Sequence, residues 1–200
     1  MMLRRLVQLY AGLVLYGVTL ALMVRANLGL DPWDVFHQGV SRHLEWSLGT
    51  VVNVVGALVL LLWFPLRQRP GLGTISNVFV IGFAVDAALT VLPPVTALPV
   101  RFGLLGAGIL LNAVATAAYI GARFGPGPRD GLMTGLVART GRSTHVVRTG
   151  IEVGVLFSGW LLGGSVGIGT VAYALLIGPL VGPLLPLLRV PEQPRTQEAV

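Results

Sequence analysis

Long apolar stretches alternate with short polar ones along the whole chain, and this pattern predicts an all-α membrane protein. The apolar stretches predict six membrane-spanning helices, at residues 3–24, 49–66, 74–92, 101–122, 145–162 and 169–188. Each has close to the roughly 17–25 residues that an α-helix needs to cross a bilayer core of about 30 Å. Two longer polar segments, residues 25–48 and 123–144, follow the first and fourth of these helices.

Each polar segment contains the pattern of a short helix. Phe36, Val40 and Leu44 recur every four residues in the first segment, as on one face of a helix. The start signals are Asp31-Pro32 and Gly127-Pro128, in which the first residue is the expected N-cap and the proline opens the helix. We expect each short helix to be amphipathic and to lie in the membrane interface or to re-enter the membrane.

The second half of the chain repeats the first at an offset of 96 residues. About twenty identities share this register over roughly ninety positions, without a gap. Gly29, Pro32 and Asp34 correspond to Gly125, Pro128 and Asp130, and the motif Gly-x-Gly-Thr occurs at residues 71–74 and again at 167–170. We therefore infer an internal duplication.

The duplication predicts the topology as well as the fold. Three membrane-spanning helices per copy is an odd number, so the second copy must be inverted relative to the first, as in many secondary transporters. We predict one membrane domain over residues 1–189, with repeats at about 3–94 and 99–189. A polar, disordered cytoplasmic tail is expected at residues 190–200.

Composition and charge agree with this picture. The chain is 54% hydrophobic and 11% charged, with a mean hydropathy of +0.80, whereas soluble domains contain about 25% charged residues. All 14 basic residues are arginines, and only Arg25, Arg42 and Arg101 would lie on the side opposite the N-terminus. This bias predicts a bacterial cytoplasmic-membrane protein with both termini in the cytoplasm. The arginines form no stripe, so the net charge of +6 does not indicate a nucleic-acid partner.

Enzymatic motifs are missing from the sequence. There is no cysteine for a disulfide or a thiolate metal site, and His37, His43 and His145 do not have the spacing of metal ligands. No nucleophile elbow occurs either. We expect no enzymatic activity, no metal and no cofactor.

The charged residues inside the predicted membrane region are the candidates for a substrate or ion site, because such residues are costly there and often functional. They are Asp34, Asp86, Arg129, Asp130, Arg148 and Glu152.

Two interpretations of these residues stay open. Asp34 and Asp130 either stabilise the starts of the short helices or line a polar cavity between the repeats together with Arg129, which would suit an anionic group. Arg148 and Glu152 are four residues apart and form either a local ion pair or an ion-coupling site. The same choice applies to Asp86, which has no partner in its own helix, although Arg25 or Arg101 could reach it.

The Gly-x-Gly-Thr motifs open the third and sixth predicted membrane helices. Threonine is a favourable N-cap, so we expect Thr74 and Thr170 at that position, with the glycines permitting a tight turn. A phosphate-binding loop is the alternative, but no Lys-Ser/Thr pair follows as in a Walker motif.

Residues 29–34, 71–74, 127–133 and 163–170 together resemble the YczE/YyaS/YitT family of bacterial membrane proteins. The resemblance covers about residues 5–189, and its most specific part is Gly-Pro-Arg-Asp-Gly at 127–131, followed by Arg139-Thr140-Gly141. It implies a multi-pass protein of the cytoplasmic membrane but no particular substrate. As candidate positions it implies Asp34, Arg129, Asp130, Arg148 and Glu152.

The predicted architecture favours a small-molecule transporter or permease acting on a small molecule or an ion. The alternative is a membrane accessory protein that transports nothing and scaffolds or regulates a partner. A transporter requires a water-accessible cavity between the repeats, and an accessory protein does not. The small helix bundle is also compatible with a homodimer in the lipid bilayer.

Overall fold

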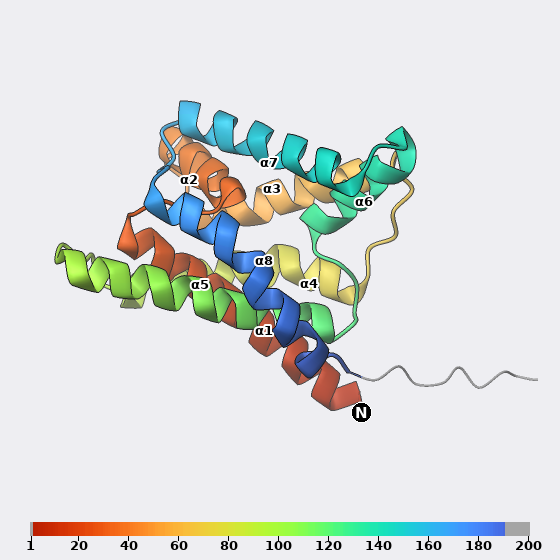
Figure 1. Cartoon of the computed structure of the whole chain (residues 1–200), viewed down its shortest axis with the longest axis horizontal. Coiled ribbons are helices and arrows are strands. Elements are labelled where there is room, and N and C mark those ends of the chain that lie inside the picture. The colour runs from red at the N-terminus through yellow and green to blue at the C-terminus, as the bar shows by residue number, and fades with distance from the viewer. Residues whose placement is uncertain (1, 191–200) are drawn as a thin grey trace, which may run out of the picture.

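The computed structural model describes residues 2–190, and throughout that range its regular structure consists of α-helices (Figure 1). They are α1 (Met2–Ala26), α2 (Pro32–Leu44), α3 (Leu48–Trp63), α4 (Leu72–Val91), α5 (Leu98–Gly121), α6 (Pro128–Thr140), α7 (Thr144–Leu161) and α8 (Ile168–Leu188). The tail predicted at residues 190–200 lies, except for Val190, outside the described residues.

The prediction of six membrane-spanning helices is confirmed in part. Helices α1, α4, α5 and α8 are long and apolar enough to cross a membrane, and α2 with α3 makes a fifth candidate span bent by 115°. Helix α3 alone has 16 residues and is only about 24 Å long at 1.5 Å per residue. Helix α7 has 18 residues but carries Arg148 and Glu152, and it is not among the helices apolar enough to count as a candidate span.

The two short helices occur where the sequence predicts them. Helix α2 begins at Pro32 with Asp31 as its N-cap, and the Asp31 carboxylate accepts the backbone N–H of Asp34 at 2.8 Å. Helix α6 begins at Pro128 after Gly127, and both helices have 13 residues. The predicted start signals are therefore confirmed.

The prediction that Thr74 and Thr170 are N-caps is wrong. The N-caps of α4 and α8 are Gly71 and Gly167, and each threonine stands at the third helical position. From there its hydroxyl accepts the N–H of the N-cap glycine, at 3.1 Å in α4 and 3.3 Å in α8. Each helix starts early because its first turn packs against the backbone of the other half of the chain, where a side chain on the N-cap residue would collide with a carbonyl oxygen.

Contacts between the halves recur in pairs at the offset of 96 residues. The backbone N–H of Gly73 donates to the carbonyl of Phe124 at 2.9 Å, and that of Gly169 donates to the carbonyl of Leu28 at 2.8 Å. At the offset of 96 residues Gly73 corresponds to Gly169 and Leu28 to Phe124. The two hydrogen bonds are therefore equivalent, with the donor in the first half in one bond and in the second half in the other. Each half therefore holds the loop that precedes the short helix of the other half.

Two arginines form a second exchanged pair. The Nε of Arg5 donates to the carbonyl of Ala122 at 3.1 Å, and the Nε of Arg101 donates to the carbonyl of Ala26 at 2.7 Å. Both arginines thus satisfy carbonyl groups at the end of a helix, where no intrahelical donor is available.

The helices form two layers. In one layer α1 packs on α4 and α5, and α5 packs on α8; in the other, α2 packs on α7 and α3, and α6 packs on α3 and α7 (Figure 1). Helix α3 also packs on α4 and so closes one side of the space between the layers. Helices α7 and α8 occupy the equivalent positions without this close packing.

A buried polar chain joins three helices of the first layer. The Asn112 amide of α5 donates to the Thr19 hydroxyl of α1 at 2.8 Å, and the Tyr173 hydroxyl of α8 donates to the Asn112 carbonyl oxygen, also at 2.8 Å. Hydrogen bonds of this kind hold membrane helices together where the hydrophobic effect does not.

Helix α3 packs closely on α4, whereas the equivalent helices α7 and α8 do not pack closely. Substituting one glycine in α4 and the equivalent glycine in α8 tests this difference. A Cβ atom at Gly82 in α4 would overlap the Asn53 side chain and the Gly49 carbonyl of α3, whereas Gly178 in α8 has no described atom within 4 Å of such a Cβ. We expect Gly82→Ala to destabilise the detergent-purified protein by about 1–3 kcal/mol, seen as a lower Tm, because α3 must move away from α4.

Gly178→Ala is the matched control. It should leave the Tm unchanged or raise it, since alanine favours a helix over glycine by up to about 1 kcal/mol. Equal destabilisation by both substitutions would show that α8 packs as tightly as α4.

Candidate functional site

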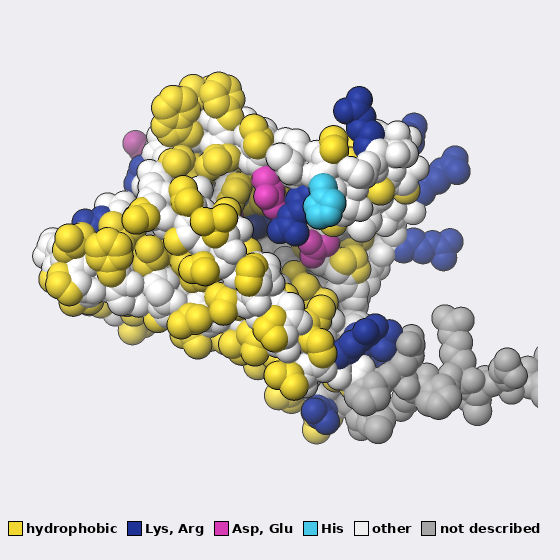
Figure 2. Space-filling view, viewed as in Figure 1, with side chains coloured by type: hydrophobic (Ala, Val, Ile, Leu, Met, Phe, Trp, Pro, Cys, Tyr) yellow, Lys and Arg dark blue, Asp and Glu magenta, His cyan; other side chains and the backbone are white. Residues whose placement is uncertain are grey.

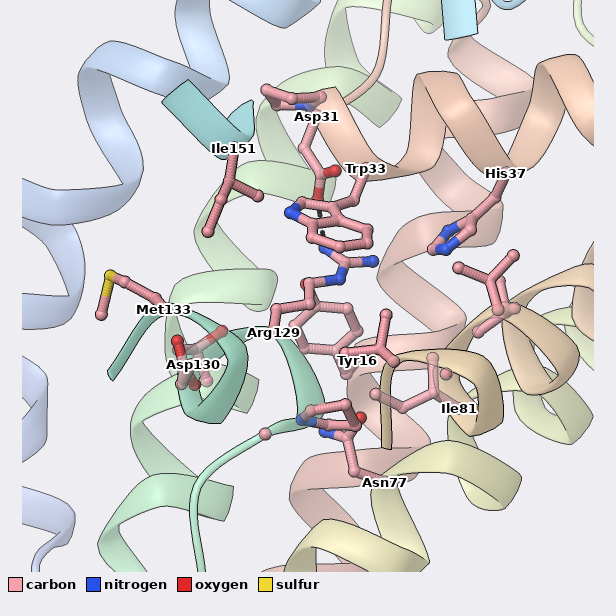
Figure 3. A pocket seen from close by; sticks show the side chains of 18 of the residues that line it. Tyr16, Asp31, Trp33, His37, Asn77, Ile81, Arg129, Asp130, Met133 and Ile151 are labelled. Atoms are coloured by element: carbon pink, nitrogen blue, oxygen red, sulfur yellow. Dashed lines mark hydrogen bonds and ion pairs between the residues drawn. The ribbon is translucent and has the colours of Figure 1, made fainter. Parts of the chain in front are cut away.

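A cavity of about 200 Å³ lies between the two layers, and all eight helices contribute to its lining. Figure 3 shows Tyr16, Trp33, His37, Arg129 and Asp130 converging on it. Nine pairs of lining positions are related by the offset of 96 residues. They include Pro32 with Pro128, Trp33 with Arg129, His37 with Met133, Asn77 with Tyr173, and Ile81 with Ile177. The two halves therefore build the cavity from equivalent backbone positions that carry different side chains.

Arg129, in the first turn of α6, occupies the centre of the cavity. Its Nη2 lies 3.2 Å from Asp34 Oδ1, and its Nη1 lies 3.5 Å from Asp31 Oδ2. The guanidinium also lies over the Trp33 ring, 5.1 Å from the centroid. These contacts connect the start of α6 in the second half with the start of α2 in the first half.

His37 extends the cluster by one turn along α2. Its Nδ1 lies 3.0 Å from Asp34 Oδ1, and since a carboxylate only accepts, Nδ1 carries the hydrogen and donates. The ring is 2% exposed and lines the cavity (Figure 3), and its Nε2 has no hydrogen-bond partner within residues 2–190. Asp34 Oδ2 is likewise buried without a partner among these residues.

Asp31 and Asp34 have different roles at the start of α2. Asp31 caps α2 with one oxygen and faces Arg129 with the other. Asp34 accepts from Arg129 and His37, so it belongs to the charged cluster. Asp31 therefore serves both the helix start and the cavity, whereas Asp34 pairs with Arg129 without lining the cavity itself.

The remaining charged candidates in the cavity come from the second half of the chain. Asp130 accepts a hydrogen bond from the Tyr119 hydroxyl at 3.4 Å. Arg148 and Glu152 form the predicted ion pair along α7, with Nε 2.8 Å from Oε1. This pair lines the cavity while remaining partly exposed, so it lies towards the opening.

Asp86 lies apart from the other candidates and does not line the cavity. Its carboxylate accepts the Ser47 hydroxyl at 2.6 Å and the backbone N–H of Gly49 at 2.7 Å, and so caps the start of α3. The expected partners Arg25 and Arg101 instead donate to backbone carbonyl groups. The expectation that either would reach Asp86 is wrong, because helix-end carbonyls lie nearer to both arginines.

Sequence reasoning did not identify several lining residues as parts of a site. Asp31 was expected only as an N-cap, and His37 only as a residue without metal spacing. Tyr16 and Tyr119 stand inside apolar helices, where a hydroxyl group normally needs a polar neighbour. Their position in the apolar segments was the signal that could have indicated a polar cavity.

Comparison with known proteins places the chain among uncharacterised proteins. Residues 3–185 match a family described as a family of unknown function (DUF6198). An uncharacterized protein of Haemophilus influenzae is 39% identical over 184 residues, which cover 92% of this chain and 84% of that protein. No solved structure matches.

Two proteins of Bacillus subtilis are also related to the chain. The uncharacterized membrane protein YczE is 32% identical over 180 residues, covering 88% of this chain and 83% of its own length. The uncharacterized protein YyaS is 24% identical over 181 residues, covering 88% and 90%. The resemblance found in the sequence is thereby confirmed: the chain belongs to the DUF6198 family and is a membrane protein related to YczE.

Proposed function

We propose that the protein is a small-molecule transporter or permease of the bacterial cytoplasmic membrane, with the cavity between the helix layers as its substrate site. The observation that supports this most is a charged cavity inside an apolar helix bundle, lined by equivalent positions of both halves. In transporters built from inverted repeats, substrates bind at the interface between the repeats near the middle of the membrane.

The burial of the charges supports a function for the cavity. Asp31 and Asp34 are 3% and 1% exposed, and they share Arg129 as their cationic partner. Buried charges cost free energy unless they are well paired, and within membranes they commonly mark substrate or ion pathways. A permease requires a polar cavity of this kind, whereas an accessory protein does not.

The proposed topology has six spans, in which α3 and α7 cross the membrane beside α1, α4, α5 and α8. The exchanged contacts at the offset of 96 residues support two inverted repeats. Figure 2 shows basic side chains at the end of the molecule that carries the N-terminus and α6, and hydrophobic side chains over most of the face between the ends. By the positive-inside rule, this distribution supports a cytoplasmic location for the N-terminus and α6.

The looser packing of α7 and α8, compared with α3 and α4, supplies a route by which a substrate reaches the cavity. Figure 2 shows acidic and basic side chains between the positions of α7 and α8, while α3 and α4 pack together on the equivalent side. If the two pairs exchange their arrangements, the cavity opens on the opposite side. Such an exchange between repeats is a common form of alternating access.

Cysteine labelling tests the topology, because the chain has no cysteine of its own. Glu45 and Arg142 are exposed residues that follow α2 and α6 at near-equivalent positions of the repeats. We expect a membrane-impermeant thiol reagent to label Glu45→Cys from outside intact cells and Arg142→Cys only in inside-out vesicles. Labelling of both from the same side would refute the inverted repeat.

The same approach tests the cavity. Asn77→Cys and Met133→Cys place a thiol in its lining, and both should react with a small hydrophilic methanethiosulfonate from at least one side, since a permease site must be reached through water. Phe83→Cys is the control, because this α4 side chain is 69% exposed on the apolar outer surface and its thiol should stay unreactive in lipid. Unreactive thiols at both cavity positions would contradict the permease and favour the accessory protein.

A further inference from the structure

The charges at the centre of the cavity do not balance. Arg129 lies opposite both Asp31 and Asp34, so one negative charge remains when His37 is neutral. The hydrogen-bond donor to Asp130 is the uncharged hydroxyl of a tyrosine. Arg148 adds no net charge because it pairs with Glu152 on its own helix. The lining as a whole is therefore negative, and a buried negative site is stabilised by a cation.

Two polar atoms of the charged cluster around Arg129 have no partner among the described residues. Asp34 Oδ2 is buried without a hydrogen bond, and His37 Nε2 has no partner among the described residues while its ring lines the cavity (Figure 3). His37 lines the cavity and Asp34 does not, so His37 Nε2 is the atom available to a molecule bound there. Buried polar atoms are rarely left unsatisfied, and Asp34 Oδ2 adds an unpaired acceptor to the same charged cluster.

Aromatic rings line the cavity together with the carboxylates. Tyr16, Trp33, Tyr119 and Tyr173 come from four different helices. The face of an aromatic ring attracts cations, and tryptophan does so most strongly. The Trp33 ring already has the Arg129 guanidinium over it, at 5.1 Å from the centroid. Carboxylates and aromatic faces around one small space form the usual recognition set for an organic ammonium group.

We infer that this cavity binds a small monovalent organic cation, held between the aromatic rings and the carboxylates of Asp31 and Asp130. The inference rests on the proposed function and names the substrate class of the same site. The cavity volume of about 200 Å³ is below the roughly 300–1,000 Å³ of pockets for drug-sized ligands, which limits the cation to about the size of choline. An anion would have to displace two carboxylates from Arg129 and would face a negative lining.

Three compounds of nearly equal shape test the charge preference. They are choline, the neutral 3,3-dimethylbutan-1-ol and the anionic 3,3-dimethylbutanoate, each titrated calorimetrically into the full-length protein in detergent. Choline should bind at least about tenfold more tightly than either of the others, because only the cation is attracted both by the aromatic faces and by the carboxylates. Absent choline binding, or equal binding of all three, would overturn the inference.

Substitutions of Asp31 and Arg129 test whether the cavity prefers a positive charge, because they should change the affinity for choline in opposite directions. Asp31→Asn removes one negative charge and should weaken choline binding about tenfold or more, while asparagine still caps α2. Arg129→Gln removes the competing cation from the Trp33 ring and should strengthen choline binding. The control is Glu45→Gln, which changes an exposed acid outside the cavity and should leave the affinity unchanged. Thermal unfolding of each variant checks that it is folded.

An anion site gives the opposite signs. If 3,3-dimethylbutanoate binds most tightly and Arg129→Gln abolishes that binding, the cavity recognises anions and the inference is wrong. The cysteine labelling of Asn77 and Met133 does not depend on the ligand, so a permease with a different substrate class would still be recognised as one.

Discussion

The contact of Arg129 with Asp31 and Asp34 is the interaction on which the rest of the site depends. It joins the first turns of α2 and α6, and so brings the two halves of the chain together at the centre of the bundle. Since a buried charge without a partner is strongly destabilising, neither short helix can leave the cluster without cost. Asp31 and Asp34 also stand at a helix N-terminus, where the backbone N–H groups favour negative charge. The same carboxylates thus start a helix and form the site.

Duplication supplies a symmetrical frame, and substitution within it supplies the chemistry. The backbone is held by exchanged contacts, such as those of Gly73 and Gly169, that are nearly the same in both halves. The side chains facing the cavity differ: Trp33 in one half stands where Arg129 stands in the other. The paired positions therefore bring an aromatic face and a cation into contact, which a strictly repeated sequence could not do.

Sequence alone predicted the features that depend on neighbours along the chain. The starts of α2 and α6 and the pairing of Arg148 with Glu152 are local, and both are confirmed. The sequence indicated Asp34 and Arg129 as possible members of one cavity. It did not predict that Asp31 joins them or which atoms pair, because the partners are about a hundred residues apart and their pairing depends on how the halves cross. The N-caps of α4 and α8 were missed for a similar reason, since the backbone of the opposite half decides where each helix begins.

The unequal packing of the two helix pairs also follows from particular residues. In the first half Asp86 accepts hydrogen bonds from Ser47 and Gly49, and so fastens α4 to the start of α3. The position equivalent to Asp86 is Gly182, which has no side chain to reach α7. No hydrogen bond links α7 to α8 within the described residues, and α7 instead carries an ion pair on the cavity side. A carboxylate present in only one copy of the repeat therefore contributes, together with the close contact of Gly82 with Asn53, to the tighter packing of α3 on α4 than of α7 on α8.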